Sequence, residues 1–86
     1  MTVEIDKKFA VEITYNGVDK KFEVEAEELV GTLLRKAVTA FGIVQNAHLL
    51  ALFRDGVELP DSKSLEQAGV KPHDVLLLRP SAVRGG

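Results

Sequence analysis

The sequence contains the stretch FAVEITYNGVDKKFEVE at residues 9–25, and this stretch decides the fold. In its first half apolar and polar residues alternate, which is the pattern of a half-buried β-strand. Asn16-Gly17 follows, and this pair is favoured in a two-residue type I′ turn because both positions need a positive φ. A second alternating run comes next, with Val18 and Phe22 on one face. The stretch therefore predicts a β-hairpin.

The alternation also predicts the pairing register of this hairpin. If Tyr15 pairs with Val18 across the turn, then Val11 lies opposite Phe22. The apolar faces of the two strands then coincide, so the hairpin offers one continuous apolar face for packing.

After the hairpin, the period of the apolar residues changes to that of a helix. Glu27 and Glu28 are expected in its first turn, where carboxylates suit the helix dipole. Gly31 is expected to mark close packing on the sheet, and Gly42 is placed as the C′ cap. The stripe predicts one helix of three to four turns, with these apolar residues at helical spacing: Val30, Leu33, Leu34, Ala37, Val38 and Phe41.

The second half of the chain predicts shorter elements. Residues 43–48 are expected to form a loop and residues 49–54 a third strand, and Asp55-Gly56 forms a tight turn into a short strand at residues 57–59. Ser62 or Ser64 can then cap a single helical turn over residues 65–68, which Gly69 closes.

Val75 to Arg79 form the last predicted strand, and its four consecutive apolar residues are typical of a central strand with parallel neighbours. A right-handed crossover from the hairpin places this strand beside the first one. The expected fold class is α+β: a β-grasp with a mixed sheet of about five strands packed on one main helix, plus a one-turn helix.

Length and composition limit the classes of function. Eighty-six residues make one domain, and a net charge of −2 argues against nucleic acid as the main partner. No apolar run has the length of a membrane span, so no membrane partner is expected, and the absence of cysteine fits a cytoplasmic location. His48 and His73 fall in separate predicted loops, so we expect neither a metal site nor a cofactor.

The chain divides into three predicted segments. Residues 1–7 read as a flexible N-terminal extension, residues 8–79 as the domain, and residues 80–86 as a flexible C-terminal tail. Pro80 has no N–H group and is not expected to continue a strand. Gly85-Gly86 lacks Cβ atoms, so this segment can pass through a channel that would exclude side chains.

From Lys8 to Gly86 the chain resembles the ubiquitin family. The chain ends in Arg84-Gly85-Gly86, as the mature proteins of that family do, and its divergence from ubiquitin points to bacterial or archaeal ubiquitin-like proteins. The helix stripe falls in register with the family, and the most specific matching motifs are Leu52-Phe53-Arg54-Asp55-Gly56-Val57-Glu58-Leu59, Asp61, Ser64-Leu65, Val70 and Val75 to Leu78.

Several positions depart from the family pattern. The tail is about two residues longer than that of ubiquitin. The turn that carries the best-known chain-forming lysine of ubiquitin reads Asp55-Gly56-Val57 here and has no lysine. Lys36 matches a lesser acceptor lysine, with a solvated side chain as the alternative, and Lys71 lies near another acceptor but is offset from it.

The resemblance also implies a recognition surface. Strand alternation is expected to turn Phe53, Leu76 and Leu78 outward and Val75 and Leu77 inward. The three outward residues match the patch through which the family is recognised, and large exposed apolar residues on a small protein indicate a binding site. The alternative is that the N-terminal extension covers them.

The resemblance implies that an E1-like enzyme adenylates the Gly86 carboxylate with ATP and that an E2-like enzyme transfers the chain to a target protein. Gly85 then lies next to the reacting residue and has no side chain to clash with an enzyme. Arg84 would bind acidic enzyme surfaces, and Arg79 would contribute a second positive charge at the base of the tail. A peptidase of the JAB type or another class would remove the chain again, so we expect a substrate of enzymes, not an enzyme.

Two other functions fit the same sequence. A sulfur carrier of the β-grasp class would convert its terminal carboxylate into a thiocarboxylate, although such carriers usually lack the ubiquitin-like spacing of the second half. A non-covalent interaction domain would bind partners through the patch, and its terminal glycines would then be incidental.

Overall fold

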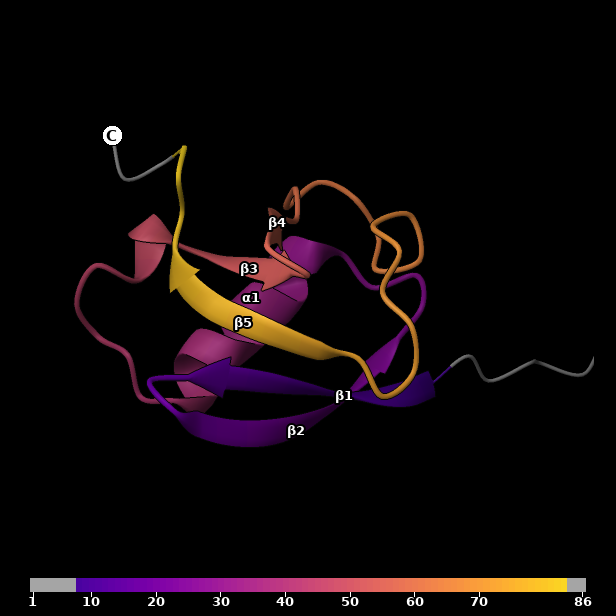
Figure 1. Ribbon diagram of the computed structural model, residues 1–86, viewed down its shortest axis with the longest axis horizontal. Helices are drawn as coiled ribbons and strands as arrows, with labels where there is room; N and C mark the ends of the chain where they lie inside the picture. The colour runs from indigo at the N-terminus through magenta and orange to yellow at the C-terminus, as the bar shows by residue number, and fades with distance from the viewer. Residues whose placement is uncertain (1–7, 84–86) are drawn as a thin grey trace, which may run out of the picture.

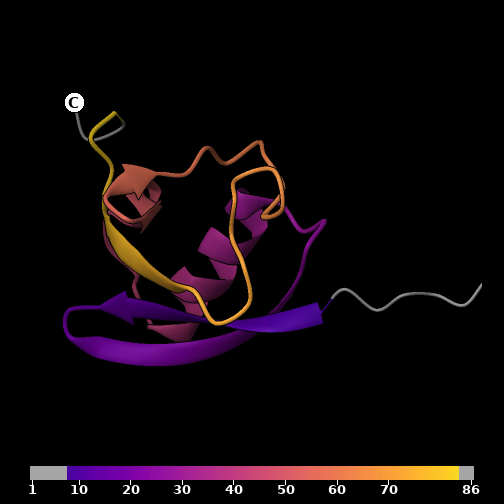
Figure 2. The ribbon, with the colours of Figure 1, turned by 45° about the vertical axis from the view of Figure 1, so that its right-hand side comes forward.

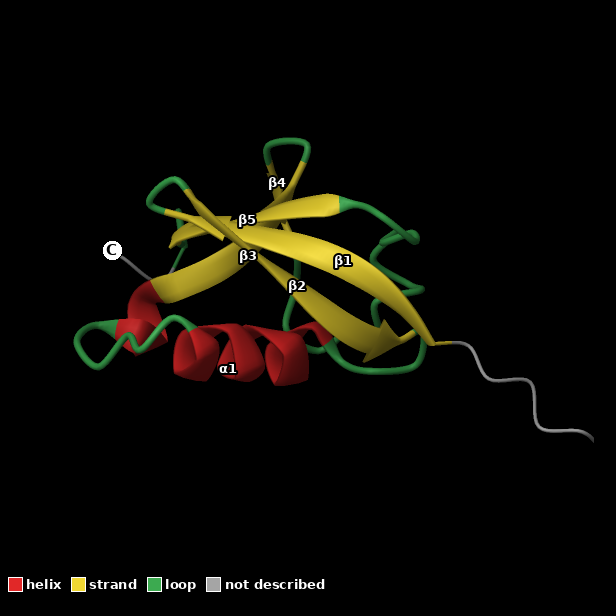
Figure 3. Cartoon of the chain, turned by 90° about the horizontal axis from the view of Figure 1, so that it is seen from below, coloured by secondary structure: helices red, strands yellow, loops and turns green. Residues whose placement is uncertain are grey.

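The computed structural model describes residues 8–83, so the expected N-terminal extension and Arg84, Gly85 and Gly86 lie outside the described residues. The described chain forms a mixed sheet in the order β2-β1-β5-β3-β4 with one α-helix against one face (Figures 1 and 3). The expected β-grasp is thus confirmed. Its elements are β1 (Lys8–Tyr15), β2 (Val18–Glu25), α1 (Val30–Ala40), the 3-10 helix η1 (Ala47–Leu49), β3 (Leu50–Arg54), β4 (Val57–Glu58) and β5 (Val75–Pro80).

The hairpin of β1 and β2 has the predicted register. Tyr15 pairs with Val18, and every following pair down the two strands is in step with it. Asn16 and Gly17 have φ values of 51° and 79°, so both turn residues are left-handed, as a type I′ turn requires.

Helix α1 ends as predicted but begins later. Gly42 follows its C-cap with a φ of 67°, which is the expected C′ glycine. Glu27 and Glu28 were expected in the first turn, and this is wrong, because the N-cap is Leu29 and the first turn contains no acidic residue. In the part of the chain that the structure describes, no helix is long and apolar enough to cross a membrane.

Backbone carbonyls of a distant loop satisfy the start of α1 in place of a side-chain cap. The N–H groups of Val30 and Gly31 donate to the carbonyl oxygens of Lys63 and Asp61 at 2.8 and 3.1 Å. A Cβ atom at position 31 would lie 3.3 Å from the Cβ of Asp61, so this glycine permits close approach of the loop. Gly31 was expected to pack closely on the sheet. It does mark close packing, but against the loop that contains Asp61.

The segment between β4 and β5 contains one helical turn, capped by Ser64. The Ser64 hydroxyl accepts the Gln67 N–H, and the Gln67 side chain accepts the Ser64 N–H, both at 3.0 Å, which forms a capping box. Residues 65–68 form hydrogen-bonded turns and no regular helix: the Ala68 N–H donates to the Ser64 carbonyl and the Gly69 N–H to the Glu66 carbonyl. The sequence predicted the short helix at residues 65–68. In the structure the short helix is η1, which begins within the loop predicted at residues 43–48.

Strand β5 lies in the middle of the sheet, between a parallel and an antiparallel neighbour. It pairs with β1 through Ile13 and Leu76, and with β3 through Leu52 and Leu78. The expected crossover beside the first strand is confirmed. All four side chains are buried in the core cluster that α1 covers.

The expected orientation of β5 is wrong by one residue. Leu76 and Leu78 are 0% and 3% exposed and belong to the core, whereas Val75 and Leu77 are 54% and 39% exposed. Four consecutive apolar residues carry no alternation of their own, so the sequence of β5 does not set its phase. Its pairing with β3 does, because Leu52 is a core residue and its partner Leu78 shares its face.

Replacement of two neighbouring leucines tests this phase. Leu76→Ala leaves a cavity in the core and is expected to lower the free energy of unfolding by about 2–5 kcal/mol. Leu77→Ala removes a half-exposed side chain and is expected to lower it by less than about 1 kcal/mol. Urea unfolding followed by circular dichroism measures both, and equal losses or a reversed order would contradict the described phase.

Candidate functional site

Helix α1 covers one face of the sheet and leaves the other face open (Figure 3). The open face carries exposed apolar side chains. Phe53, Val75, Leu77 and Arg79 lie on this face, and we call them the outer-face patch. Phe53 on β3 pairs directly with Leu77 on β5. Val75, Leu77 and Arg79 alternate with buried residues along β5, and each of the three is exposed. The patch therefore extends along one side of the central strand.

Arg79 covers the aromatic residue of the patch. Phe53 faces outward as predicted, but it is only 9% exposed, because the guanidinium carbon of Arg79 lies 5.3 Å from the centre of its ring. This is the geometry of a cation–π contact. The exposed surface of the patch therefore consists of Val75 and Leu77 beside a positive charge, in place of the Phe53, Leu76 and Leu78 expected from the sequence.

The first residues of the expected tail are held against the domain. Pro80 was not expected to continue the strand, and this is wrong: it is the last residue of β5 and pairs with Leu50. The bond to the neighbouring segment is made by the next N–H, from Ser81 to the Leu49 carbonyl, so the missing N–H of Pro80 does not exclude this pairing. The next residue, Ser81, is buried, and its hydroxyl donates to the Glu58 carboxylate at 2.6 Å. Ala82 donates its N–H to the same carboxylate. The sequence did not predict that Glu58 binds the start of the tail. The only feature that marks Glu58 in the sequence is that it is an acidic residue in a very short predicted strand.

Both ends of the described chain are visible in the ribbon views. The start of β1 and the end of β5 lie on opposite sides of the molecule (Figures 1 and 2). Strand β5, which carries most of the outer-face patch, ends at Pro80, close to the C-terminal end of the described chain.

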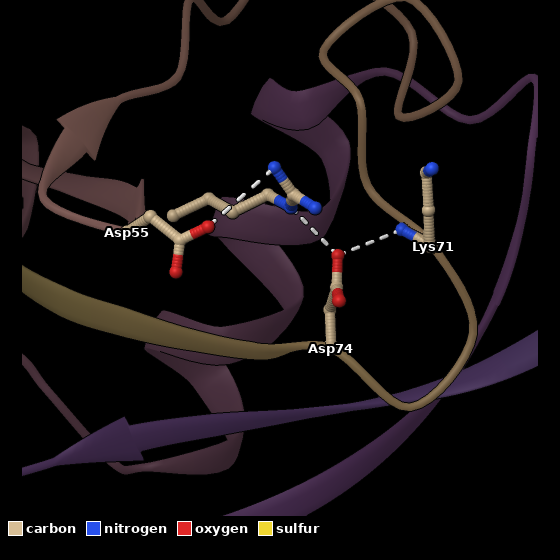
Figure 4. A network of polar contacts seen from close by, with 4 residues as sticks. Asp55, Lys71 and Asp74 are labelled. Atoms are coloured by element: carbon tan, nitrogen blue, oxygen red, sulfur yellow. Dashed lines mark hydrogen bonds and ion pairs between the residues drawn. The ribbon is translucent and has the colours of Figure 1, made fainter.

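An ion pair fixes the other end of β5 (Figure 4). The Nε of Arg54, at the end of β3, donates to the Oδ2 of Asp74 at 2.7 Å, and the Lys71 N–H donates to the same oxygen at 2.8 Å. The Asp74 carbonyl accepts the Glu12 N–H at 2.9 Å. Asp55 contributes little, since its carboxylate is exposed and lies 3.8 Å from Arg54. The network joins the loop before β5 to β1 and to β3.

This network shifts the pKa of both charged partners. Partial burial acts to raise the pKa of Asp74, but the hydrogen bonds from Arg54 and from the Lys71 N–H, with their positive charges, outweigh burial and hold it below its usual value. The hydrogen bond to Asp74 raises the pKa of Arg54, so the guanidinium stays charged. The pair is ionised at neutral pH.

The two candidate acceptor lysines lie apart from the outer-face patch in the fold. Lys36 is on α1, and its Nζ lies 2.9 Å from a carboxylate oxygen of Glu28. Lys71 is exposed in the loop before β5, where its backbone N–H binds Asp74. Their role as acceptors stays a prediction.

The two histidines are not brought together. His73 lies in the loop before β5, and His48 lies in η1, at the edge of an open groove of about 540 Å³ on the helix side of the molecule. Leu34 and Val38 of α1 also line this groove. Among residues 8–83 no group of three or more side chains could hold a metal ion.

Comparison with known proteins gives structural matches only. No protein-family model matches the sequence, and no curated protein matches it. Among solved structures, the ubiquitin of Caldiarchaeum subterraneum has a TM-score of 0.75 and 24% identity, over 92% of this chain and 99% of that one. The ubiquitin-like domain of an Arabidopsis thaliana protein has a TM-score of 0.75 and 19% identity, over 90% of this chain and 81% of that one.

A third match is to a larger protein. The crystal structure of ATBAG1 in complex with HSP70 has a TM-score of 0.75 and 19% identity, over 90% of this chain but only 42% of that one. The chain thus spans less than half the length of ATBAG1. At these identities the similarities show the ubiquitin-like β-grasp fold.

The Arg54–Asp74 pair predicts a pH dependence of stability. The pKa of Asp74 is lower in the folded chain than the value of about 3.9 for an unfolded one, so its stabilisation is present above that pH and is lost as pH falls through the folded pKa. Asp74→Asn is therefore expected to lower the urea midpoint at pH 7, and its difference from the parent should shrink as pH falls below about 4.

Asp55→Asn is the matched control, because it removes the same charge beside the same arginine without a close hydrogen bond. We expect it to change the urea midpoint far less than Asp74→Asn. Equal losses in the two variants, or a difference between Asp74→Asn and the parent that is constant from pH 2.5 to 7, would contradict the assignment.

Proposed function

We propose that the chain is a ubiquitin-like protein modifier that is activated at its Gly86 carboxylate. The observation that carries the proposal is the course of β5, which leads from the outer-face patch to a segment whose sequence reads Arg84-Gly85-Gly86. The ubiquitin-like β-grasp fold, and the match to an archaeal ubiquitin over almost all of that chain, support it. Within this proposal the chain is a modifier of the bacterial or archaeal kind.

The proposed chemistry begins at the terminal carboxylate. A carboxylate oxygen of Gly86 attacks the α-phosphate of ATP on an E1-like enzyme, and pyrophosphate leaves. An enzyme nucleophile then takes the acyl group and AMP leaves, and an E2-like enzyme passes the acyl group to an amine of the target protein. A peptidase of the JAB type or another class hydrolyses the resulting amide.

The remaining site residues have recognition roles in this proposal. Gly85 has no side chain, so the segment can enter a narrow channel, and Arg84 can form ion pairs with acidic enzyme surfaces. The exposed Val75 and Leu77 form the apolar part of a protein-binding surface. Arg79 supplies a cation at its border, and it must move before a partner can contact the ring of Phe53.

A non-covalent interaction domain is the second candidate, and one observation favours it. This chain matches only 42% of the ATBAG1 chain, and its Arabidopsis match is a ubiquitin-like domain of a protein. Such domains occur as parts of longer proteins. In this alternative the outer-face patch acts without the terminal glycines.

Deletion of Gly86 tests the covalent role. We expect the parent chain, incubated with ATP and the E1-like and E2-like enzymes of its source organism, to form adducts with other proteins that mass spectrometry traces to Gly86. The deletion shortens the reach of the carboxylate by about 3.5 Å and should reduce adduct formation at least about 100-fold.

Leu77→Ala is the companion variant, because it truncates the patch and leaves the carboxyl end intact. It should still form the adduct with the E1-like enzyme, at a lower rate. Partner binding that needs Leu77 but no adduct with the parent would support the interaction domain. A sulfur-for-oxygen mass shift on the chain itself would support a sulfur carrier.

A further inference from the structure

A buried serine lies where the chain leaves the sheet. Ser81 is 5% exposed, and among residues 8–83 it is the one polar or charged residue that is buried. It directly follows Pro80, the last residue of β5, which pairs with Leu50. A buried polar group needs hydrogen-bond partners, so the surroundings of this serine should be specific.

The carboxylate of Glu58 supplies these partners. One oxygen, Oε2, accepts the Ser81 hydroxyl at 2.6 Å, and the other, Oε1, accepts the Ala82 N–H at 3.1 Å. A hydroxyl–carboxylate bond of this length is among the stronger hydrogen bonds in proteins, because the acceptor is ionised. Both oxygens of one side chain therefore bind two successive residues, and we call this arrangement the Glu58 clip.

Two more hydrogen bonds complete the clip. The Ser81 N–H donates to the Leu49 carbonyl at 2.8 Å, and the Val83 N–H donates to the Ser81 hydroxyl oxygen at 3.0 Å. Three consecutive backbone N–H groups after Pro80 are thus satisfied, the first by a backbone carbonyl of the neighbouring chain segment and the next two by side-chain oxygens. Val83 itself is 80% exposed, so its side chain does not help to hold this segment.

The strand that carries Glu58 is short and lies at the edge of the sheet. Strand β4 has two residues, and Glu58 is held by pairing with Phe53, a member of the outer-face patch. The Leu59 N–H donates to the Leu52 carbonyl at 2.8 Å and extends this anchorage. The clip is therefore built on the same part of β3 as the patch.

We propose that Glu58 is a positioning residue for the C-terminal segment: its carboxylate clips Ser81 and Ala82 to the domain and thereby sets the point and direction from which the last residues extend. The purpose of this positioning rests on the proposed function. In that function the reacting residue is Gly86, three residues after Val83 in the sequence and so at most about 10 Å from it, and the place where Val83 is held limits the positions that an enzyme could find it in.

The clip also lowers the cost of binding for an enzyme that takes the terminal carboxylate. A segment that is already ordered loses less conformational entropy when it is bound. Loss of the clip should therefore raise the concentration of the chain at which its activation is half-maximal, with little change in the maximal rate.

The first test uses the isolated chain and needs no enzyme. In Glu58→Ala, amide hydrogen exchange measured by NMR should be at least about tenfold faster at Ala82, while the thermal midpoint stays near that of the parent. Ser81→Ala should speed exchange at Val83, whose acceptor is lost, and Ser81→Thr should restore it. Glu23→Ala, which removes an exposed carboxylate from β2, is the matched control and should change neither amide.

Two results would overturn the clip. One is unchanged exchange at Ala82 in Glu58→Ala. The other is faster exchange throughout the sheet with a lower thermal midpoint, since Glu58 would then serve only the stability of the fold.

The second test uses the E1-like enzyme of the Gly86 experiment. Glu58→Ala should raise the half-saturating concentration of the chain at least about threefold and leave the maximal rate within about twofold, and Glu23→Ala should change neither. Equal half-saturating concentrations for the parent and Glu58→Ala would refute the positioning role. Absence of activation in the parent would refute the proposed function, and the exchange result would still decide whether the clip exists.

Discussion

The central place of β5 in the sheet is the constraint on which the rest of the structure depends. Because β5 pairs with β1 on one side and β3 on the other, the phase of its side chains is fixed twice. Leu76 is in register with Ile13, and Leu78 with Leu52, and all four pack into one core against α1. Leu77 must then face solvent. The core and the outer-face patch are therefore two consequences of the same pairing.

Carboxylates hold both ends of this strand. At its start, Asp74 binds the side chain of Arg54, and at its end Glu58 binds Ser81 and the residue after it. A strand usually frays where its ladder stops. The last backbone bond from this end of β5 to its neighbour is from the Ser81 N–H to the Leu49 carbonyl, and the next N–H, that of Ala82, donates to the Glu58 carboxylate. The two networks therefore hold the residues that flank β5 at both ends.

The sequence predicts the contacts that local patterns determine. The register of the hairpin follows from alternation and from Asn16-Gly17, because only a few residues separate the partners. The phase of β5 could not be predicted from its own uniform apolar run, and pairing with Leu52 decides it. The bond between Glu58 and Ser81 joins residues 23 positions apart and depends on how β4 lies against the sheet, so no spacing rule reveals it.

The outer-face patch and the Glu58 clip belong to one row of residues across three strands. Leu77 on β5 pairs with Phe53 on β3, and Phe53 pairs in turn with Glu58 on β4. Arg79, two residues beyond Leu77, covers the ring of Phe53, and Ser81 follows two residues later. A protein that binds the patch therefore contacts the strand positions that also anchor the chain exit. In the proposed function, the sheet thus joins the surface that a partner would bind to the residues that hold Ser81 and Ala82.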